Sequence, residues 1–143
     1  MEPSGISSTL IRVNYSETDQ MGVVYHARYV VWLDIARTEH LREAGMAYRD
    51  VEAAGHRLAV AELAIRFGQP ARYDDLVRVR CWVRDLASRR VTFGYAIEHA
   101  DSGRLLATAT TSMMSVDAAM TPARLPDAVR RLLRAVPDPV RIH

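Results

Sequence analysis

The chain has 143 residues and a formal net charge of +2, and its composition, 49% hydrophobic and 25% charged, is that of one soluble globular domain. No apolar stretch reaches the roughly 20 residues that a membrane span needs, and no basic leader precedes an apolar core, so we expect neither a span nor a secretory signal. The single Cys81 excludes an intrachain disulfide and agrees with a reducing cytoplasm, the lack of Cys and His clusters argues against a metal site, and no basic run favours nucleic-acid binding.

The first elements expected along the chain are a strand, a polar turn and a long helix. Residues 7–15 alternate weakly between apolar and polar side chains and predict a strand, and residues 16–22 are rich in turn-forming residues. Residues near 26–44 predict the main helix, which Gly45 ends. Because residues 29–36 are apolar on nearly every side, we expect the N-terminal half of this helix to lie in the core.

The remaining sequence predicts mainly strands. The alternating segments are residues 58–67, 76–84, 91–97 and 105–116. The first of these changes phase, which places a β-bulge near Ala61 and Glu62. A short amphipathic helix is expected at about residues 127–135, after Pro126.

This order predicts an α+β fold in one domain over residues 1–143. The expected architecture is a hotdog fold, in which a curved antiparallel sheet of about five strands wraps around one long central helix. A single sheet layer on one helix leaves a small core and open sheet edges. We therefore expect a homodimer or homotetramer that forms through an edge strand.

Residues 13–42, with the sequence VNYSETDQMGVVYHARYVVWLDIARTEHLR, carry the most informative motif. The segment resembles the N-terminal signature of the 4-hydroxybenzoyl-CoA thioesterase superfamily, and most of all its YbgC-type acyl-CoA thioesterases. The matching positions are Tyr15, Thr18, Asp19, Gly22, Val23, Val24, Tyr25, His26, Tyr29, Ala36, Arg37, Thr38 and Glu39. The likeness continues more loosely to the Arg-Leu-Pro turn before the last helix. It implies hydrolysis of an acyl-CoA, with coenzyme A as part of the substrate and no separate cofactor.

Asp19 is the predicted catalytic carboxylate. Thioester hydrolysis needs a group that activates water or attacks the carbonyl, and donors that stabilise the oxyanion. Asp19 lies just before a helix whose first amides, near His26 and Ala27, are unpaired and carry partial positive charge, so they would polarise a bound carbonyl. Gly22 lacks a Cβ and suits a backbone that turns sharply and approaches a substrate. The alternative is that Asp19 only caps the helix or a turn.

Three further residues of the motif and one outside it are candidates for the site. The resemblance implicates His26 in catalysis, although it could also be a half-buried helix residue satisfied by hydrogen bonds. Tyr15 could position the Asp19 carboxylate or pack on the helix as a strand residue, and Tyr25 is placed with the substrate-binding residues. Glu62 is the other acidic candidate, for which a surface position is favoured.

The coenzyme A end is expected at arginines. In the superfamily the pantetheine arm lies in a groove at a subunit interface, and the phosphates lie near the surface. Ser88, Arg89 and Arg90 match the place where relatives carry phosphate contacts, and Arg124 is a weaker candidate. Guanidinium groups bind phosphate bidentately, so no glycine-rich loop is required. For Arg37 and Glu39 we expect structural ion pairs or hydrogen bonds.

Two other functions compete with this one. A thioesterase for acyl carrier protein would use the same site, and a non-catalytic acyl-CoA-binding hotdog module would keep only the fold. The presence of Tyr15, Asp19 and His26 together argues against the second. Hotdog dehydratases carry a different Asp/His arrangement in a longer signature, which this sequence lacks. The sequence does not define the acyl group.

Overall fold

The fold consists of one five-stranded antiparallel sheet with a long helix against it, in a computed structural model that describes residues 5–53 and 55–142. The strands are β1 (Ser7–Arg12), β2 (Arg57–Phe67), β3 (Leu76–Leu86), β4 (Arg90–His99) and β5 (Leu105–Val116). The helices are η1 (Tyr15–Glu17, 3₁₀), α1 (His26–Glu43), α2 (Tyr48–Ala53) and α3 (Asp127–Leu132). The strand order is β1-β3-β4-β5-β2, so β1 and β2 are the edge strands. Within the described part of the chain, no helix has the length and apolar character to cross a membrane.

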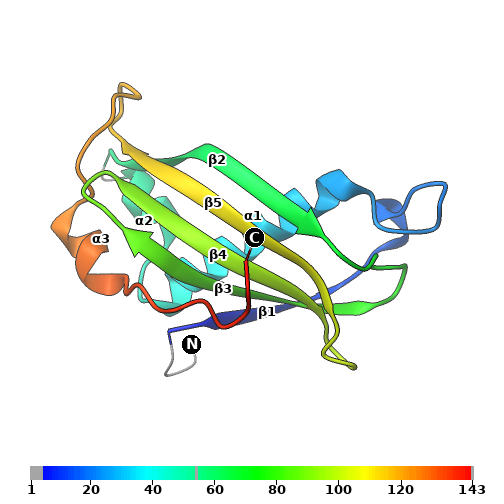
Figure 1. Cartoon of the computed structure of the whole chain (residues 1–143). Helices are drawn as coiled ribbons and strands as arrows, with labels where there is room; N and C mark the ends of the chain where they lie inside the picture. Colours follow the sequence, from blue (N-terminus) through cyan, green and yellow to red (C-terminus); the bar gives the residue numbers. More distant parts are fainter. Residues whose placement is uncertain (1–4, 54, 143) are drawn as a thin grey trace.

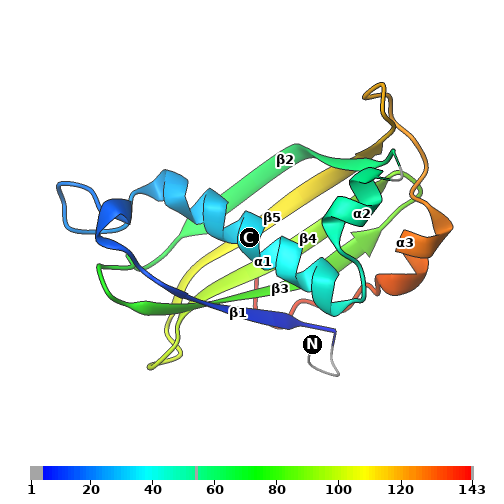
Figure 2. The same ribbon diagram turned by 180° about the vertical axis from the view of Figure 1, so that it is seen from behind.

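Helix α1 lies along the inner face of the curved sheet (Figure 2). Its buried side chains recur every three or four residues, as one face of a helix requires: Tyr29, Trp32, Leu33, Ala36, His40 and Leu41. Strand β3 presents alternate residues to this face, and each of them is fully buried: Val77, Val79, Cys81 and Val83. The core therefore lies between α1 and the sheet, which confirms the predicted hotdog architecture.

The prediction that the N-terminal half of α1 lies wholly in the core is wrong for one side of the helix. Tyr29, Trp32 and Leu33 are buried there, but three neighbouring apolar residues are exposed. The adjacent edge strand β2 also exposes apolar side chains, and the ring of Phe67 packs edge-on at 5.1 Å from that of Tyr29. The exposed residues, which we call the α1–β2 apolar strip, are Val30, Val31, Ile35, Val60, Leu63 and Phe67. One sheet layer does not cover all the apolar surface of the helix.

The observed elements differ from the predicted ones by more than two residues at one end of β1 and of α3, and by one additional helix. β1 ends at Arg12 instead of residue 15, because a capping box at Asn14 and Glu17 starts η1. α3 ends at Leu132 instead of residue 135, because the next residue is already extended. Helix α2 was not predicted. The β-bulge in β2 is confirmed, since the register with β5 shifts between Val60 and Glu62.

The outer face of the sheet carries a second, smaller cluster that the C-terminal tail (residues 134–142) covers (Figure 1). Trp82 is fully buried in this cluster, and Gly94 opposite it leaves room for the indole, because a Cβ there would lie 2.6 Å from the ring. Asp138 anchors the tail by accepting hydrogen bonds from Trp82 Nε1 at 2.9 Å and from Arg84 at 2.9 and 2.8 Å. The other members of the cluster are Ile6, Ala96, Val136, Val140 and Ile142.

Candidate active site

The segment between η1 and α1 folds into a tight hairpin with Asp19 at its turn. Thr18 pairs with Val24, and the Asp19 N–H donates to the Val23 carbonyl at 2.9 Å. The Gly22 N–H closes the turn by donating to the Asp19 carbonyl at 3.0 Å. Gly22 has a φ of +78°, which other residues rarely adopt, so glycine is required by the turn itself. The hairpin returns the chain from Asp19 directly to the start of α1.

Contacts with the helix and with the loop between β2 and β3 hold this hairpin in place. The Val24 N–H donates to the Ala71 carbonyl at 2.8 Å, and the Ala71 N–H donates to the Tyr29 hydroxyl at 3.2 Å. Burial raises the pKa of the Tyr29 phenol, which keeps it protonated. On the other side, Trp32 Nε1 donates to Glu17 Oε2 at 2.8 Å. Asp19 thus lies on a hairpin that is anchored at both ends.

The turn forms a hydrogen bond with only one of the two oxygens of the Asp19 carboxylate. The Met21 N–H donates to Asp19 Oδ1 at 2.8 Å, so the turn-capping role that the sequence left open does exist. Oδ2 accepts no hydrogen bond from any residue that the structure describes, and the side chain is partly exposed. One carboxylate oxygen is therefore held and the other is available to a substrate or water.

The first amides of α1 are also unpaired. Tyr25 is the N-cap residue, and its side chain makes no capping hydrogen bond. The Arg28 N–H donates back to the Tyr25 carbonyl at 2.9 Å, but the amides of His26 and Ala27 find no acceptor in residues 5–53 or 55–142. Free amides at a helix N-terminus combine hydrogen-bond donors with the positive end of the helix dipole. They can accommodate the oxygen of a polarised carbonyl.

The aromatic residues of the motif lie at the surface around this hairpin. His26 is exposed, and its ring lies 4.4 Å from that of Tyr25. Tyr15 is 76% exposed, and the centroid of its ring lies 5.5 Å from that of Tyr73. Tyr73 was not among the residues predicted from the sequence. Tyr15 is therefore not a strand residue packed on the helix, and among the described residues its hydroxyl makes no hydrogen bond to Asp19.

The predicted phosphate contacts lie at the opposite end of the sheet. Ser88, Arg89 and Arg90 form the turn between β3 and β4, hereafter the 88–90 turn, at the left of Figure 1, whereas the Asp19 hairpin is at the right. The Leu125 N–H donates to the Ser88 carbonyl at 2.9 Å, which ties the turn to the segment before α3. One chain does not bring the two parts of the predicted site together.

The remaining candidates have structural or surface positions. Glu62 is exposed, as expected, and Arg124 is exposed and lies 3.9 Å from Asp127. The structural roles expected on α1 are confirmed. Arg37 Nη2 donates to Asp34 at 2.7 Å, and Glu39 forms an ion pair with Arg42.

Comparison with known proteins identifies the class. The sequence profile of the thioesterase-like superfamily matches residues 13–133, so the chain belongs to this superfamily. The acyl-CoA thioester hydrolase YbgC of Escherichia coli O6:H1 (strain CFT073) is 32% identical over 120 residues, which are 83% of this chain and 89% of that protein. A hypothetical protein from Thermus thermophilus has a crystal structure with a TM-score of 0.85, 42% identity and coverage of 89% of this chain and 96% of that one. The DHNA-CoA thioesterase of Staphylococcus aureus has a TM-score of 0.81 and 31% identity, covering 84% of this chain and 80% of that one.

Proposed function

We propose that the protein hydrolyses an acyl-CoA thioester to the free acid and coenzyme A, with Asp19 as the catalytic carboxylate. One observation carries the proposal: a carboxylate with one free oxygen lies on an anchored hairpin that leads directly into two unpaired helix amides. The names of two relatives support the substrate class, since YbgC is called an acyl-CoA thioester hydrolase and the staphylococcal protein a DHNA-CoA thioesterase.

Each part of the hairpin has a role in the proposed reaction. The thioester carbonyl oxygen binds at the amides of His26 and Ala27, which stabilise the negative charge of the tetrahedral intermediate. Asp19 Oδ2 either takes a proton from the attacking water or attacks the carbonyl carbon itself, while the Met21 amide holds Oδ1. Collapse of the intermediate breaks the C–S bond and releases the coenzyme A thiolate. It leaves the free acid where water attacked; where Asp19 attacked it leaves an acyl–Asp19 anhydride, which water then hydrolyses to the free acid and the Asp19 carboxylate. His26 supports the step from the surface, and no cofactor enters it.

The site is completed, in this proposal, by a second copy of the chain. The α1–β2 apolar strip leaves 39–53% of each of its side chains exposed along an open sheet edge, and such edges favour strand pairing. Pairing of β2 with its own copy about a twofold axis is antiparallel and reverses the partner end for end. The 88–90 turn of the second copy then lies at the same end of the dimer as Asp19, where Arg89 and Arg90 contact phosphate.

A thiol-release assay with short, long and aromatic acyl-CoAs tests the proposed function. We expect turnover of at least one thioester and none of the corresponding oxygen ester control at the same enzyme concentration. Tight binding of acyl-CoA without release of thiol would instead show a binding module. Single-turnover hydrolysis in ¹⁸O-labelled water distinguishes the two roles of Asp19, because label in its carboxylate requires an anhydride intermediate.

A further inference from the structure

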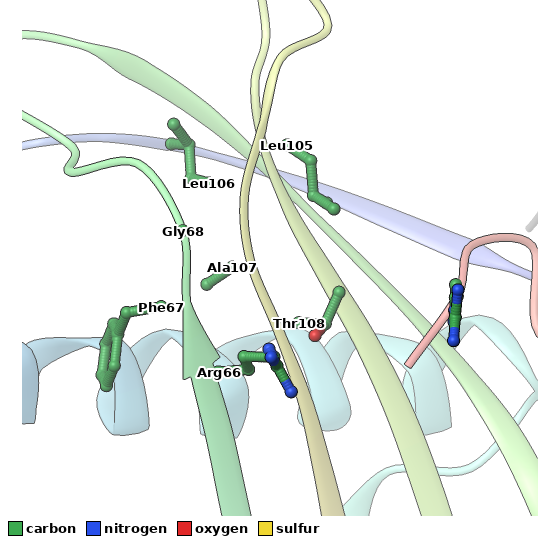
Figure 3. A pocket seen from close by; sticks show the side chains of 8 residues that line it. Arg66, Phe67, Gly68, Leu105, Leu106, Ala107 and Thr108 are labelled. Atoms are coloured by element: carbon green, nitrogen blue, oxygen red, sulfur yellow. The ribbon is translucent and has the colours of Figure 1, made fainter. Parts of the chain in front are cut away.

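A pocket of about 280 Å³ lies at the C-terminal end of β2, and two arginines from distant parts of the chain line it. Arg66 comes from β2 and Arg141 from the C-terminal tail, and both are exposed. Figure 3 shows Arg66 and Thr108 on the neighbouring strands β2 and β5, which pair in register. The remaining lining residues are Phe67, Gly68, Leu105, Leu106 and Ala107. We call this the β2-end pocket.

Among the described residues, the two arginines of the β2-end pocket have no carboxylate partner. Neither side chain forms an ion pair or hydrogen bond with any residue in the described ranges. The acidic groups on the outer face are used elsewhere, because Asp138 binds Arg84 and Glu98 lies 3.7 Å from Arg80. Glu62 is also remote, since it pairs in register with Ser112, whereas Arg66 pairs with Thr108. Within the described ranges, the positive charge of the pocket is therefore uncompensated.

The packing of the tail fixes the backbone of Arg141 beside this pocket. Its neighbours Val140 and Ile142 both pack into the outer-face cluster around Trp82. Thr108, which is 5% exposed, lines the same pocket as the two arginines. Two guanidinium forks and a hydroxyl are the donors that phosphate oxygens accept from.

The β2-end pocket is continuous with further space on the outer face of the sheet. It adjoins a second hollow of about 220 Å³ that shares Arg66 and Thr108 and extends along the outer face. This hollow adds Ala64, Thr110 and Ile142 to its lining. Small side chains and a hydroxyl suit a sugar that is attached to the phosphate.

The pocket and Asp19 lie at the same end of the same chain. Phe67 lines the pocket and also packs against Tyr29 on α1. Gly68 on its rim is three residues from Ala71, so the two Cα atoms are at most about 11 Å apart. Ala71 in turn bonds to Val24 of the Asp19 hairpin. The loop between β2 and β3 therefore connects the pocket to the Asp19 hairpin.

We infer that Arg66, Arg141 and Thr108 bind a phosphate group of the nucleotide part of coenzyme A, on the same chain that supplies Asp19. This inference rests on the proposed function. Coenzyme A carries a diphosphate and a separate 3′-phosphate, so the pocket binds one of these anionic groups and the 88–90 turn of a second copy binds the other. The site then receives phosphate contacts from both chains.

The double variant Arg66→Ala/Arg141→Ala tests this assignment against Arg104→Ala, a matched control at an exposed arginine outside the pocket. We expect the double variant to lower the ratio of kcat/KM for an acyl-CoA to kcat/KM for the same acyl-pantetheine by at least about tenfold, since about 1.4 kcal/mol of binding free energy is a factor of ten. Acyl-pantetheine lacks the nucleotide, so a general loss of activity does not move this ratio. The Arg104→Ala ratio should stay within twofold of that of the wild type.

Calorimetric binding of 3′-phosphoadenosine 5′-phosphate separates failure of this inference from failure of the proposed function. If the wild type hydrolyses no thioester but binds this nucleotide through Arg66 and Arg141, the result supports the pocket assignment and contradicts the proposed function. If the wild type hydrolyses acyl-CoA and the double variant behaves like Arg104→Ala in both measurements, the pocket assignment is overturned.

Discussion

The two ends of α1 each carry a histidine beside a potential partner, in opposite settings. At the N-terminal end His26 is exposed next to the Asp19 hairpin, where a carboxylate oxygen and two helix amides lack partners. At the C-terminal end His40 is 2% exposed, and its Nδ1 lies 2.8 Å from Ser7 Oγ. Asp19 and His26 at one end, and Ser7 and His40 at the other, are residue types that occur in hydrolase sites.

The buried Ser–His pair is closed to a substrate. Ser7 is 1% exposed, and its Oγ lies 3.1 Å from the Cys81 carbonyl and 2.8 Å from His40 Nδ1, so both side chains are satisfied within the core. A nucleophile and its base must instead reach the bound substrate. Burial also lowers the pKa of His40, which keeps the imidazole neutral. Open access and unsatisfied hydrogen-bonding groups, more than residue types, distinguish the functional end of the helix from the structural one.

The largest expected effect is at the open end of the helix. Asp19→Asn retains the acceptor for the Met21 amide but removes the base or nucleophile, so kcat should fall by at least about 10²-fold with little change in KM. Steady-state thiol release checks the loss, and an unchanged melting curve checks the fold. Near-wild-type turnover would transfer the catalytic role away from Asp19.

His40→Ala should show the reverse pattern at the closed end. The substitution leaves a cavity and removes a buried hydrogen bond, so the free energy of unfolding should fall by about 2–4 kcal/mol. Urea unfolding measures this value. Turnover per folded molecule should stay close to that of the wild type, and a loss comparable to that of Asp19→Asn would contradict the division between the two ends.

His26→Ala should have a smaller effect than Asp19→Asn, because the backbone amides assigned to the oxyanion survive the substitution. We expect kcat to fall by about tenfold, or about 1.4 kcal/mol of transition-state stabilisation. Parallel rate measurements on the two variants give the order. A His26 effect larger than the Asp19 effect would make the imidazole the central group.

The buried histidine should also make stability depend on pH. Because the pKa of His40 is lowered from its ordinary value of 6.5, the unfolded chain binds a proton that the folded chain does not. Stability should therefore fall as the pH drops below about 6.5, by up to about 1.4 kcal/mol per pH unit until the folded pKa is reached. Urea titrations at pH 7 and pH 5 measure the slope, and His40→Gln should flatten it relative to the wild type.

The smallest expected effect belongs to the remote 88–90 turn. Arg89→Ala/Arg90→Ala should raise KM for an acyl-CoA several-fold and leave kcat largely intact, because the nucleotide is bound alike in the ground and transition states. An unchanged KM would mean that the second copy does not supply the phosphate contact. Light scattering that finds only monomer at micromolar concentration would lead to the same conclusion.

Local sequence patterns were sufficient for the elements that position the site. The apolar spacing from His26, the stop at Gly45 and the phase change near Glu62 are short-range signals, and the structure has the helix and the bulge there. Helix α2 was not predicted, because its six residues are too few to show a helical period. The position of Arg141 beside Arg66 was not predictable, since it depends on how the tail crosses the sheet.

The separation of Asp19 from the 88–90 turn could have been found from strand parity. β1 leads to the end of the sheet that carries Asp19, and α1 then returns the chain to the other end. Each later antiparallel strand reverses direction again, so the turn after β3 falls at the end away from Asp19. Counting the reversals needs only the order of the elements.

The position of Cys81 makes the reaction of its thiol a measure of unfolding. It is the only thiol in the chain, it is fully buried under α1, and burial raises its pKa, so a thiol reagent does not reach it in the folded state. In a thiol-release assay the signal then comes from coenzyme A alone while the molecule stays folded. In a destabilised variant, one further equivalent of thiol per chain would react slowly. The rate of this reaction measures how often α1 separates from the sheet and exposes Cys81.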